Sequence, residues 1–568
     1  MNLKMVKNLF LKHSKFVIWL LLVSFSTLSC KKDIPEEASD LTAPTLKRIN
    51  LADNCLDVGV TSSLYILFSE EMDTSTVTTN IESTSCSGNV QLSADNFASC
   101  VQMLNNPQPD TDKKAFTVFP SSSLSDNTTY KVKLTAGLRD KAGNHMASEY
   151  ALSNGFTTET QSVSGLTYWT KQIGTGQDDY TKGIVLDSSN GFYITGRTES
   201  SFTTDSNNGA WDIFLVKLDS SGITDWKRQA GTSNNDYAEA VVVDSSNDVY
   251  IAGKTEGTLE SGITRASDTS SDIILIKYDS TGDSKWQKQL GSSKNDWAFA
   301  VAADSQNNIY VTGKTEGALT GSNLGGSDIF LAKYDKNGGH LWTRQTGTST
   351  DESAYGIVID SNNNIYITGH TQGRIGTMPH KGKRDIFVIK LNTSGEITWS
   401  RQIGSDQDDY ARGIALDVFG NILVTGYSYG DFVTTNLGDS DLVLFKMDTD
   451  GDLLWWKQMG TDLKEQGKSV LVDGNGDVFV AGLTYGSMNC RSNLGFSDFI
   501  LVKFDFSGAQ QWVKQYGSVG LDYGKGLVLN SDDELLFAGS TGGSIDGNIS
   551  KGKTDLLVFK YDRNGNRQ

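Results

Sequence analysis

Apolar runs separated by polar turns repeat along the last seven-tenths of the chain, over about residues 165–568. Each repeat has four apolar runs of about five to seven residues and no stretch of helical period. A W-x-x-Q-x-G motif opens every copy, with its tryptophan at Trp169, Trp226, Trp286, Trp342, Trp399, Trp455 and Trp512. Seven such units predict seven four-stranded blades that close into a β-propeller around a central channel.

The two ends of the repeat region predict how the ring closes. The region begins with a lone tryptophan strand at 166–174, and it ends at 560–568, where the next tryptophan strand would be due. Pairing the first strand with the last blade completes that blade and removes exposed sheet edges. We name the strands of a blade A to D from the channel outward, so that GIVLD lies in strand A and the tryptophan in strand D.

The segment 44–158 lacks this repeat. Apolar and polar positions alternate in TYKVKLTA, which is typical of a strand with one buried face, and several such runs predict a β-sandwich. Residues 159–165 are expected to form a linker to the propeller, which we place at 166–568. The predicted fold class is therefore all-β.

The N-terminus has the pattern of an export signal. A basic segment with four lysines precedes an apolar run at 16–28, which is too short to span a membrane. The run ends at Ser29-Cys30, which resembles the lipobox of bacterial lipoproteins, although threonine stands where leucine is usual. The resemblance implies cleavage after residue 29, lipidation of Cys30 and a flexible tether at 30–43. A cleaved secretory signal with an incidental cysteine is the alternative.

Two further resemblances concern the folded regions. The phrases N-x-Y-x-T-G and D-x-F-x-x-K-x-D-x-x-G, followed by tryptophan, resemble the SBBP β-propeller repeat of bacterial exported proteins. Part of this pattern also resembles pyrroloquinoline-quinone propeller repeats, which occur in dehydrogenases and in cofactor-free scaffolds. In the segment 44–158, F-S-E-x-M-D and D-x-A-G-N resemble the bacterial Ig-like domain of surface-layer and adhesin proteins, where this domain is usually a spacer.

Charge narrows the range of partners. The 50 basic and 68 acidic residues give a net charge of −18, and loss of the signal segment deepens it. An acidic surface repels nucleic-acid phosphates and anionic lipid headgroups, so we expect neither as a ligand. Contact with the membrane is expected through acyl chains, and the protein is expected to be a monomer.

The cysteines suit an exported protein. Cys86 and Cys100 flank two short predicted strands, and we expect a disulfide between them. Cys55 and Cys490 have no evident partner in the sequence, so a buried free thiol is the simplest interpretation for each.

Motifs for catalysis or metal binding are weak. The G-x-S-x-G match at 426–430 falls in a register where the other repeats have threonine, so Ser428 is interpreted as structural. The mature chain has four histidines and no H-E-x-x-H or Cys/His cluster, and its Asp-rich turns lack the final glutamate of a calcium loop. We therefore predict no catalytic residues, metal or cofactor.

Ligand binding is expected where the blades differ, which is in the loops between strands B and C. The fourth of these loops, QGRIGTMPHKGKR, is basic within an acidic chain. It is the predicted contact for an anionic partner, through Arg374, His380, Lys381, Lys383 and Arg384.

These features predict a non-enzymatic, lipid-anchored exported protein. The propeller would bind a protein or a glycan on an Ig-like spacer, in the cell envelope and at the outer membrane. The alternatives are a periplasm-facing assembly scaffold and an enzyme that acts at the channel mouth, as in lyases, sialidases and quinoproteins.

Overall fold

The computed structural model describes residues 40–49, 51, 55, 58, 63–158, 168–203, 208–267, 269–376, 379–488, 493 and 495–568. Within these residues the protein consists of strands and turns without an α-helix, and none of their elements is a helix that could cross a membrane. The predicted signal segment, Cys30, the linker at 159–165 and Cys490 lie outside the described residues.

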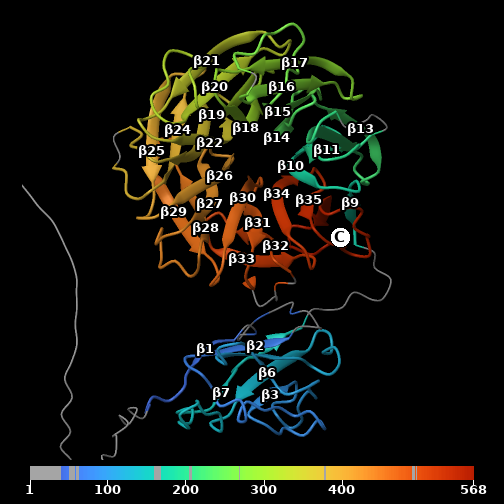
Figure 1. The fold of residues 1–568 in the computed structure, drawn as a ribbon, viewed down its shortest axis with the longest axis vertical. Coiled ribbons are helices and arrows are strands. Elements are labelled where there is room, and N and C mark those ends of the chain that lie inside the picture. The colour runs from blue at the N-terminus through green and yellow to red at the C-terminus, as the bar shows by residue number, and fades with distance from the viewer. Residues whose placement is uncertain are drawn as a thin grey trace, which may run out of the picture.

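The first domain is a β-sandwich of two four-stranded sheets (Figure 1). One sheet has the order β1-β2-β5-β4, with strands β1 (Leu46–Ile49), β2 (Leu64–Phe68), β5 (Ala115–Val118) and β4 (Gln108–Pro109). The other has the order β3-β6-β7, with β8 also paired to β6: β3 (Val90–Ser93), β6 (Thr129–Leu134), β7 (Tyr150–Ala151) and β8 (Phe156–Thr157). Strand β6 alternates buried and partly exposed residues because one face packs on the core.

Three described cysteines of this domain are disulfide-bonded. A disulfide joins Cys86 to Cys100, with Cα atoms 5.0 Å apart. Cys55 is also disulfide-bonded. The expected free thiol at Cys55 is therefore wrong.

The second domain is a ring of seven four-stranded antiparallel sheets, as the repeat predicts (Figure 1). The A strands surround the channel: β10 (Asp179–Leu186), β14 (Asp236–Val243), β18 (Asp296–Ala303), β22 (Glu352–Ile359), β26 (Asp409–Leu416), β30 (Glu465–Val472) and β34 (Asp522–Leu529). The B strands follow: β11 (Phe192–Thr198), β15 (Val249–Thr255), β19 (Ile309–Thr315), β23 (Ile365–Thr371), β27 (Ile422–Ser428), β31 (Val478–Thr484) and β35 (Leu535–Thr541).

The outer half of each blade is formed by strands C and D. The C strands are β12 (Asp212–Leu218), β16 (Asp272–Tyr278), β20 (Asp328–Tyr334), β24 (Asp385–Leu391), β28 (Asp441–Met447), β32 (Asp498–Phe504) and β36 (Asp555–Tyr561). The D strands are β13 (Thr224–Ala230), β17 (Ser284–Leu290), β21 (His340–Thr346), β25 (Ile397–Ile403), β29 (Leu453–Met459), β33 (Gln510–Tyr516) and β9 (Thr170–Ile173). Strands B and C are buried along almost their whole length because neighbouring blades cover both faces.

The ring closes as predicted. Strand β9, from the start of the repeat region, pairs antiparallel with β36 of the last blade, and Leu556 lies opposite Ile173. The backbone N–H of Trp169 also donates a hydrogen bond to the carbonyl of Gln568. The two ends of the propeller are thereby held in one sheet, and the last blade has four strands like the other six.

The repeated tryptophans connect neighbouring blades. The indole N–H of Trp169 donates to the carbonyl of Ser221, in the turn between strands C and D of the next blade, and Trp226 makes the equivalent bond to Ser280. A glycine with positive φ follows in each of these turns, and a Cβ on Gly222 would collide with the Trp169 ring. The tryptophan series therefore has a structural role between blades.

The acid that begins each A strand is buried between blades. Asp409 has no exposed surface, and it accepts hydrogen bonds from the backbone N–H and the hydroxyl of Ser405. Burial, and then the nearby Asp385 carboxylate, raise the pKa of Asp409 to about 7, and burial raises that of Asp522 to about 6. These acids are therefore structural groups of the blade interfaces and do not form an exposed ring at the channel mouth.

Candidate functional site

In the basic loop of blade four, the side chains of His380 and Arg384 contact different partners. The Nδ1 atom of His380 lies 3.2 Å from the carboxylate of Asp385, inside the blade, whereas the guanidinium of Arg384 lies 3.0 Å from Asp408. The Arg384 guanidinium also lies 5.7 Å from the centre of the Tyr410 ring, at the channel. Arg374, Lys381 and Lys383 belong to the same loop, of which residues 377–378 lie outside the described part. The contact with Tyr410 places Arg384, one of the predicted contact residues, at the channel mouth.

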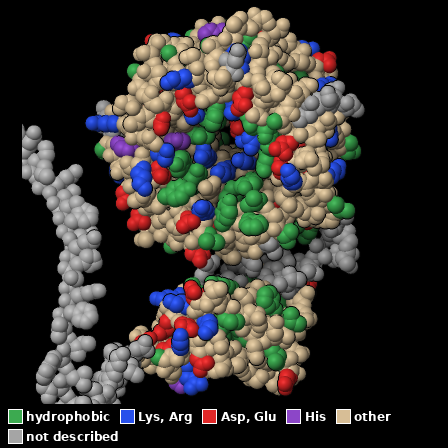
Figure 2. Space-filling view, viewed as in Figure 1, with side chains coloured by type: hydrophobic (Ala, Val, Ile, Leu, Met, Phe, Trp, Pro, Cys, Tyr) green, Lys and Arg blue, Asp and Glu red, His purple; other side chains and the backbone are tan. Residues whose placement is uncertain are grey.

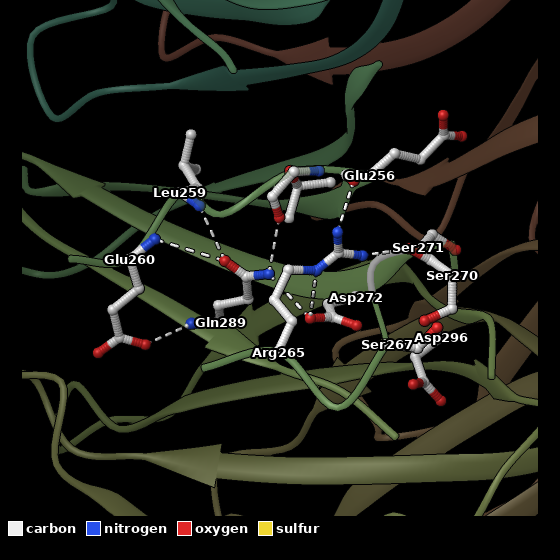
Figure 3. Close-up of polar contacts among 12 residues, drawn as sticks. Glu256, Leu259, Glu260, Arg265, Ser267, Ser270, Ser271, Asp272, Gln289 and Asp296 are labelled. Carbon is white, nitrogen blue, oxygen red and sulfur yellow. Dashed lines mark hydrogen bonds and ion pairs between the residues drawn. The ribbon is translucent and has the colours of Figure 1, made fainter. Parts of the chain in front are cut away.

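A wide hollow between blades one and two is lined by polar residues, and the arginine among them, Arg265, already has hydrogen-bond partners inside the protein. In Figure 3, Arg265 lies within the blade, where its guanidinium donates to Asp272 at 3.2 Å and to the carbonyls of Glu256 and Ser270. Gln289 donates to the same carboxylate at 2.8 Å. All of these contacts are internal, so Arg265 fixes the loop between strands B and C. The hollow is therefore a weaker candidate than the channel.

The fourth residue of each A strand lines the channel. In all seven blades the pairing register between strands A and B shifts at this residue, which is the position of a β-bulge. A bulge bends the strand and changes the direction of the side chain, so these seven residues project into the channel. We call this set the channel waist: Lys182, Glu239, Phe299, Tyr355, Arg412, Lys468 and Lys525.

The waist lines a cavity of about 470 Å³, within the size range of small-ligand sites. Lysine, arginine and hydrophobic side chains gather around this central opening in Figure 2. The waist side chains keep part of their surface accessible, although protein surrounds them on several sides. Sequence analysis missed this site because the bulge that exposes the fourth residue cannot be seen in the repeat pattern.

One side of the waist is basic. Arg412, Lys468 and Lys525, which we call the basic cluster, come from three consecutive blades. Arg412 donates to the Tyr427 hydroxyl at 2.9 Å, and the Lys468 ammonium donates to the side-chain carbonyl of Gln466 at 2.7 Å. No carboxylate forms an ion pair with any of the three among the residues that the structure describes.

The neighbouring waist residues differ in kind. Lys182 forms an ion pair with Glu239 at 2.8 Å, so its charge is compensated. Phe299 and Tyr355 stack with ring centres 4.5 Å apart, and the Arg412 guanidinium lies 4.0 Å from the centre of the Tyr355 ring. The waist therefore places an aromatic wall beside a basic cluster, which no sevenfold structural role requires.

Aromatic residues surround the mouth of the channel at the end where the turns between strands D and A lie. We call them the aromatic rim: Tyr180, Trp211, Tyr237, Trp297, Tyr410 and Tyr429. Basic side chains lie between the rings. The Arg197 guanidinium is within 5.1 Å of the ring centres of Tyr180, Trp211 and Tyr237. These contacts hold the rings in position through cation–π attraction.

Burial and repulsion between basic groups disfavour the charged forms of Lys468 and Lys525. Burial, followed by repulsion from Lys182, lowers the pKa of Lys525 to about 7, and burial with repulsion from Lys525 holds that of Lys468 well below its usual value. Burial also lowers the pKa of His370 to about 3, so this histidine, which lies 4.8 Å from Tyr410, is neutral near pH 7. Bringing an anion into the channel would oppose this repulsion and favour protonated lysines.

Comparisons with known proteins agree with the two-domain architecture. Residues 40–158 match the bacterial Ig-like domain family. Five segments match the SBBP beta-propeller repeat: 169–203, 225–259, 285–319, 341–376 and 398–432.

Two curated proteins are similar over part of their length. The chain is 25% identical over 347 residues to the regulatory protein FlaEY of Caulobacter vibrioides, which covers 54% of this chain and 36% of that protein. It is 20% identical over 501 residues to an uncharacterised WD repeat-containing protein of Acanthamoeba polyphaga mimivirus, which covers 66% of this chain and 36% of that protein. The chain thus spans about a third of the length of each relative.

Solved propellers are similar at low sequence identity. An ulvan lyase has 10% identity and a TM-score of 0.43, over 68% of this chain and 95% of that one. The propeller domain of the Trilobed protease from Pyrococcus furiosus has 10% identity and a TM-score of 0.37, over 70% of this chain and 96% of that one. From the family matches and the sheet topology, the chain consists of a bacterial Ig-like domain followed by a seven-bladed β-propeller with SBBP repeats.

Proposed function

We propose that this protein is a lipid-anchored, exported binding protein whose propeller takes a saccharide at the mouth of its channel. The Ig-like domain serves as the spacer between the anchor and the propeller. An Ig-like domain and a propeller together support a binding or scaffold platform. The N-terminal signal pattern and Cys30 support export and lipid attachment.

The aromatic rim is the observation that carries the choice of a saccharide. A sugar ring presents an apolar C–H face and a polar edge of hydroxyls, and it packs on exposed aromatic faces that have polar groups close by. Arg197, Lys254 and Lys314 lie between the rings of the rim, and Trp297 lies within 4.5 Å of the two lysine ammonium groups. The concave mouth suits a narrow chain end better than the broad surface of a folded protein.

A glycan array tests the proposal with the mature protein, purified in detergent. Wild-type protein is expected to bind a subset of glycans, and Trp297→Ala with Tyr410→Ala is expected to abolish this binding. Trp456, which is exposed on strand β29 of blade five, provides a matched control, because Trp456→Ala removes an aromatic ring far from the mouth. Binding that survives the double substitution, or that is lost in Trp456→Ala, would contradict a saccharide site at the rim.

A further inference from the structure

The basic cluster of the waist is not needed to build the propeller. Its three residues occupy the same bulge position that holds glutamate, phenylalanine and tyrosine in blades two to four. All seven blades form the same strand pairs around this position. The blade geometry therefore accepts any of these side chains, and the concentration of basic residues in blades five to seven needs another explanation.

The cluster is electrostatically costly without a ligand. Arg412 stays charged at all ordinary pH values, and its Nε atom is buried without a hydrogen-bond partner in the described part of the chain. No hydrogen bond or ion pair of Lys525 occurs among the described residues, although Lys182, Arg412 and Lys468 all repel it. An anion between these groups would remove the repulsion and supply the missing acceptor.

The surroundings of the cluster define the chemistry of the anion. The planar guanidinium of Arg412 matches the oxygens of a carboxylate or a sulfate, and lysines add point charges. Beside it, the stacked Phe299 and Tyr355 offer an apolar wall for a ring, and Glu239 offers an acceptor for a hydroxyl. The cavity of about 470 Å³ has room for a sugar residue rather than for an inorganic ion alone.

We infer that the channel waist binds the carboxylate or sulfate group of an acidic sugar at the end of a glycan chain. Arg412, Lys468 and Lys525 hold the anionic group, and the ring lies along Phe299 and Tyr355. The inference rests on the proposed function, which places the glycan at the rim above. It adds the class of sugar and the residues that select it.

Calorimetry with three small probes tests this inference on the mature protein in detergent. The probes are methyl β-D-glucuronide, its neutral counterpart methyl β-D-glucoside, and sodium sulfate. We expect the glucuronide to bind at least about tenfold more tightly than the glucoside, because only the former offers an anion to the basic cluster. Lys525→Met and Arg412→Met are each expected to weaken glucuronide and sulfate binding about tenfold, with little change for the glucoside.

Lys553→Met is the matched control, because Lys553 is an exposed lysine of blade seven outside the channel. It should leave the binding of all three probes unchanged, and circular dichroism checks that each variant keeps its β structure. Equal affinity for glucuronide and glucoside, or sulfate binding that persists in Lys525→Met, would overturn the anion site.

The failure of this inference differs from failure of the proposed function. If neutral and acidic glycans bind the rim equally and sulfate does not bind, the saccharide site stands and the acidic-sugar inference falls. If no saccharide binds while sulfate binding depends on Lys525, the anion site stands and the saccharide function falls.

Discussion

Two positions of the A strands, three residues apart, differ in how much their residue type changes around the ring. The first position is an acid in all seven blades, and it is buried at the interface with the preceding blade. The fourth position is a bulge that faces the channel, and it changes from lysine to glutamate, to an aromatic residue and to arginine. Residues that repeat sevenfold therefore hold the blades together, whereas residues that break the repeat are free to serve a ligand.

The largest expected effect is a difference in unfolding free energy between two substitutions. One removes a phenylalanine at a blade interface, and the other removes a phenylalanine at the waist. Phe330 of blade three has no exposed surface, and Phe330→Ala should cost about 3 to 5 kcal/mol of unfolding free energy through lost burial and a cavity. Phe299→Ala, in the same blade but at the channel, should cost about 1 kcal/mol, because solvent fills the space that the ring leaves. Urea denaturation measures both, and equal losses would contradict the distinction between the two positions.

The repeated acids also predict how stability depends on pH. The folded state raises the pKa of Asp409 from 3.8 to about 7, so between these values it binds more protons than the unfolded state does. The contribution of Asp409 is therefore fully present below about pH 4, is lost as pH rises toward 7, and changes little above that. The loss should be on the order of 2 to 4 kcal/mol, and thermal unfolding across this range measures it.

Asp409→Asn provides the control for this prediction. The amide keeps the size of the side chain but does not titrate, so the variant should lose part of the fall in stability between pH 4 and 7. An unchanged pH dependence would show that Asp409 is not protonated in the folded protein.

The sequence predicts the fold well for a physical reason. Each strand and turn occurs seven times, so features such as Trp169 and its equivalents stand out, and the missing strand of the last blade predicts the pairing of β36 with β9. The waist could not be predicted in this way. Each of its residues occurs once, and its exposure depends on a bulge, which brings together residues as distant as Lys182 and Lys525. The basic loop of blade four stood out in the sequence, but its contacts divide between the blade interior and the mouth.

The channel lysines predict that anion binding is coupled to proton uptake. Lys525, whose pKa is lowered to about 7, faces Lys182, Arg197, Glu239, Arg412 and Lys468. A bound sulfate favours its charged form, so binding at pH 7.5 should take up protons, and affinity should fall about tenfold between pH 6 and 8. Calorimetry in buffers of different ionisation enthalpy measures the uptake. Lys525→Met should reduce it, and binding without proton uptake would place the anion away from Lys525.

The smallest expected effect is a change in sulfate affinity when Glu239, the only acidic residue of the waist, is substituted. Glu239 holds Lys182 in an ion pair at 2.8 Å and so keeps this lysine from acting on an anion in the channel. Glu239→Gln removes the negative charge but keeps the length of the side chain, so a fourth basic group becomes available, and sulfate should bind several-fold more tightly. The same substitution replaces a charged acceptor for a sugar hydroxyl with the weaker oxygen of an amide, so glucuronide should gain less than sulfate does.

Glu256→Gln is a matched control for Glu239→Gln, because Glu256 pairs with Lys254 at the rim, 3.1 Å away, and does not line the waist. It should change sulfate affinity much less, because rim charges are more strongly screened by solvent than charges inside the channel. Equal gains in the two variants would mean that sulfate responds to the overall charge of the mouth. A gain confined to Glu239→Gln would instead locate the anion at the waist, where the sevenfold repeat is broken.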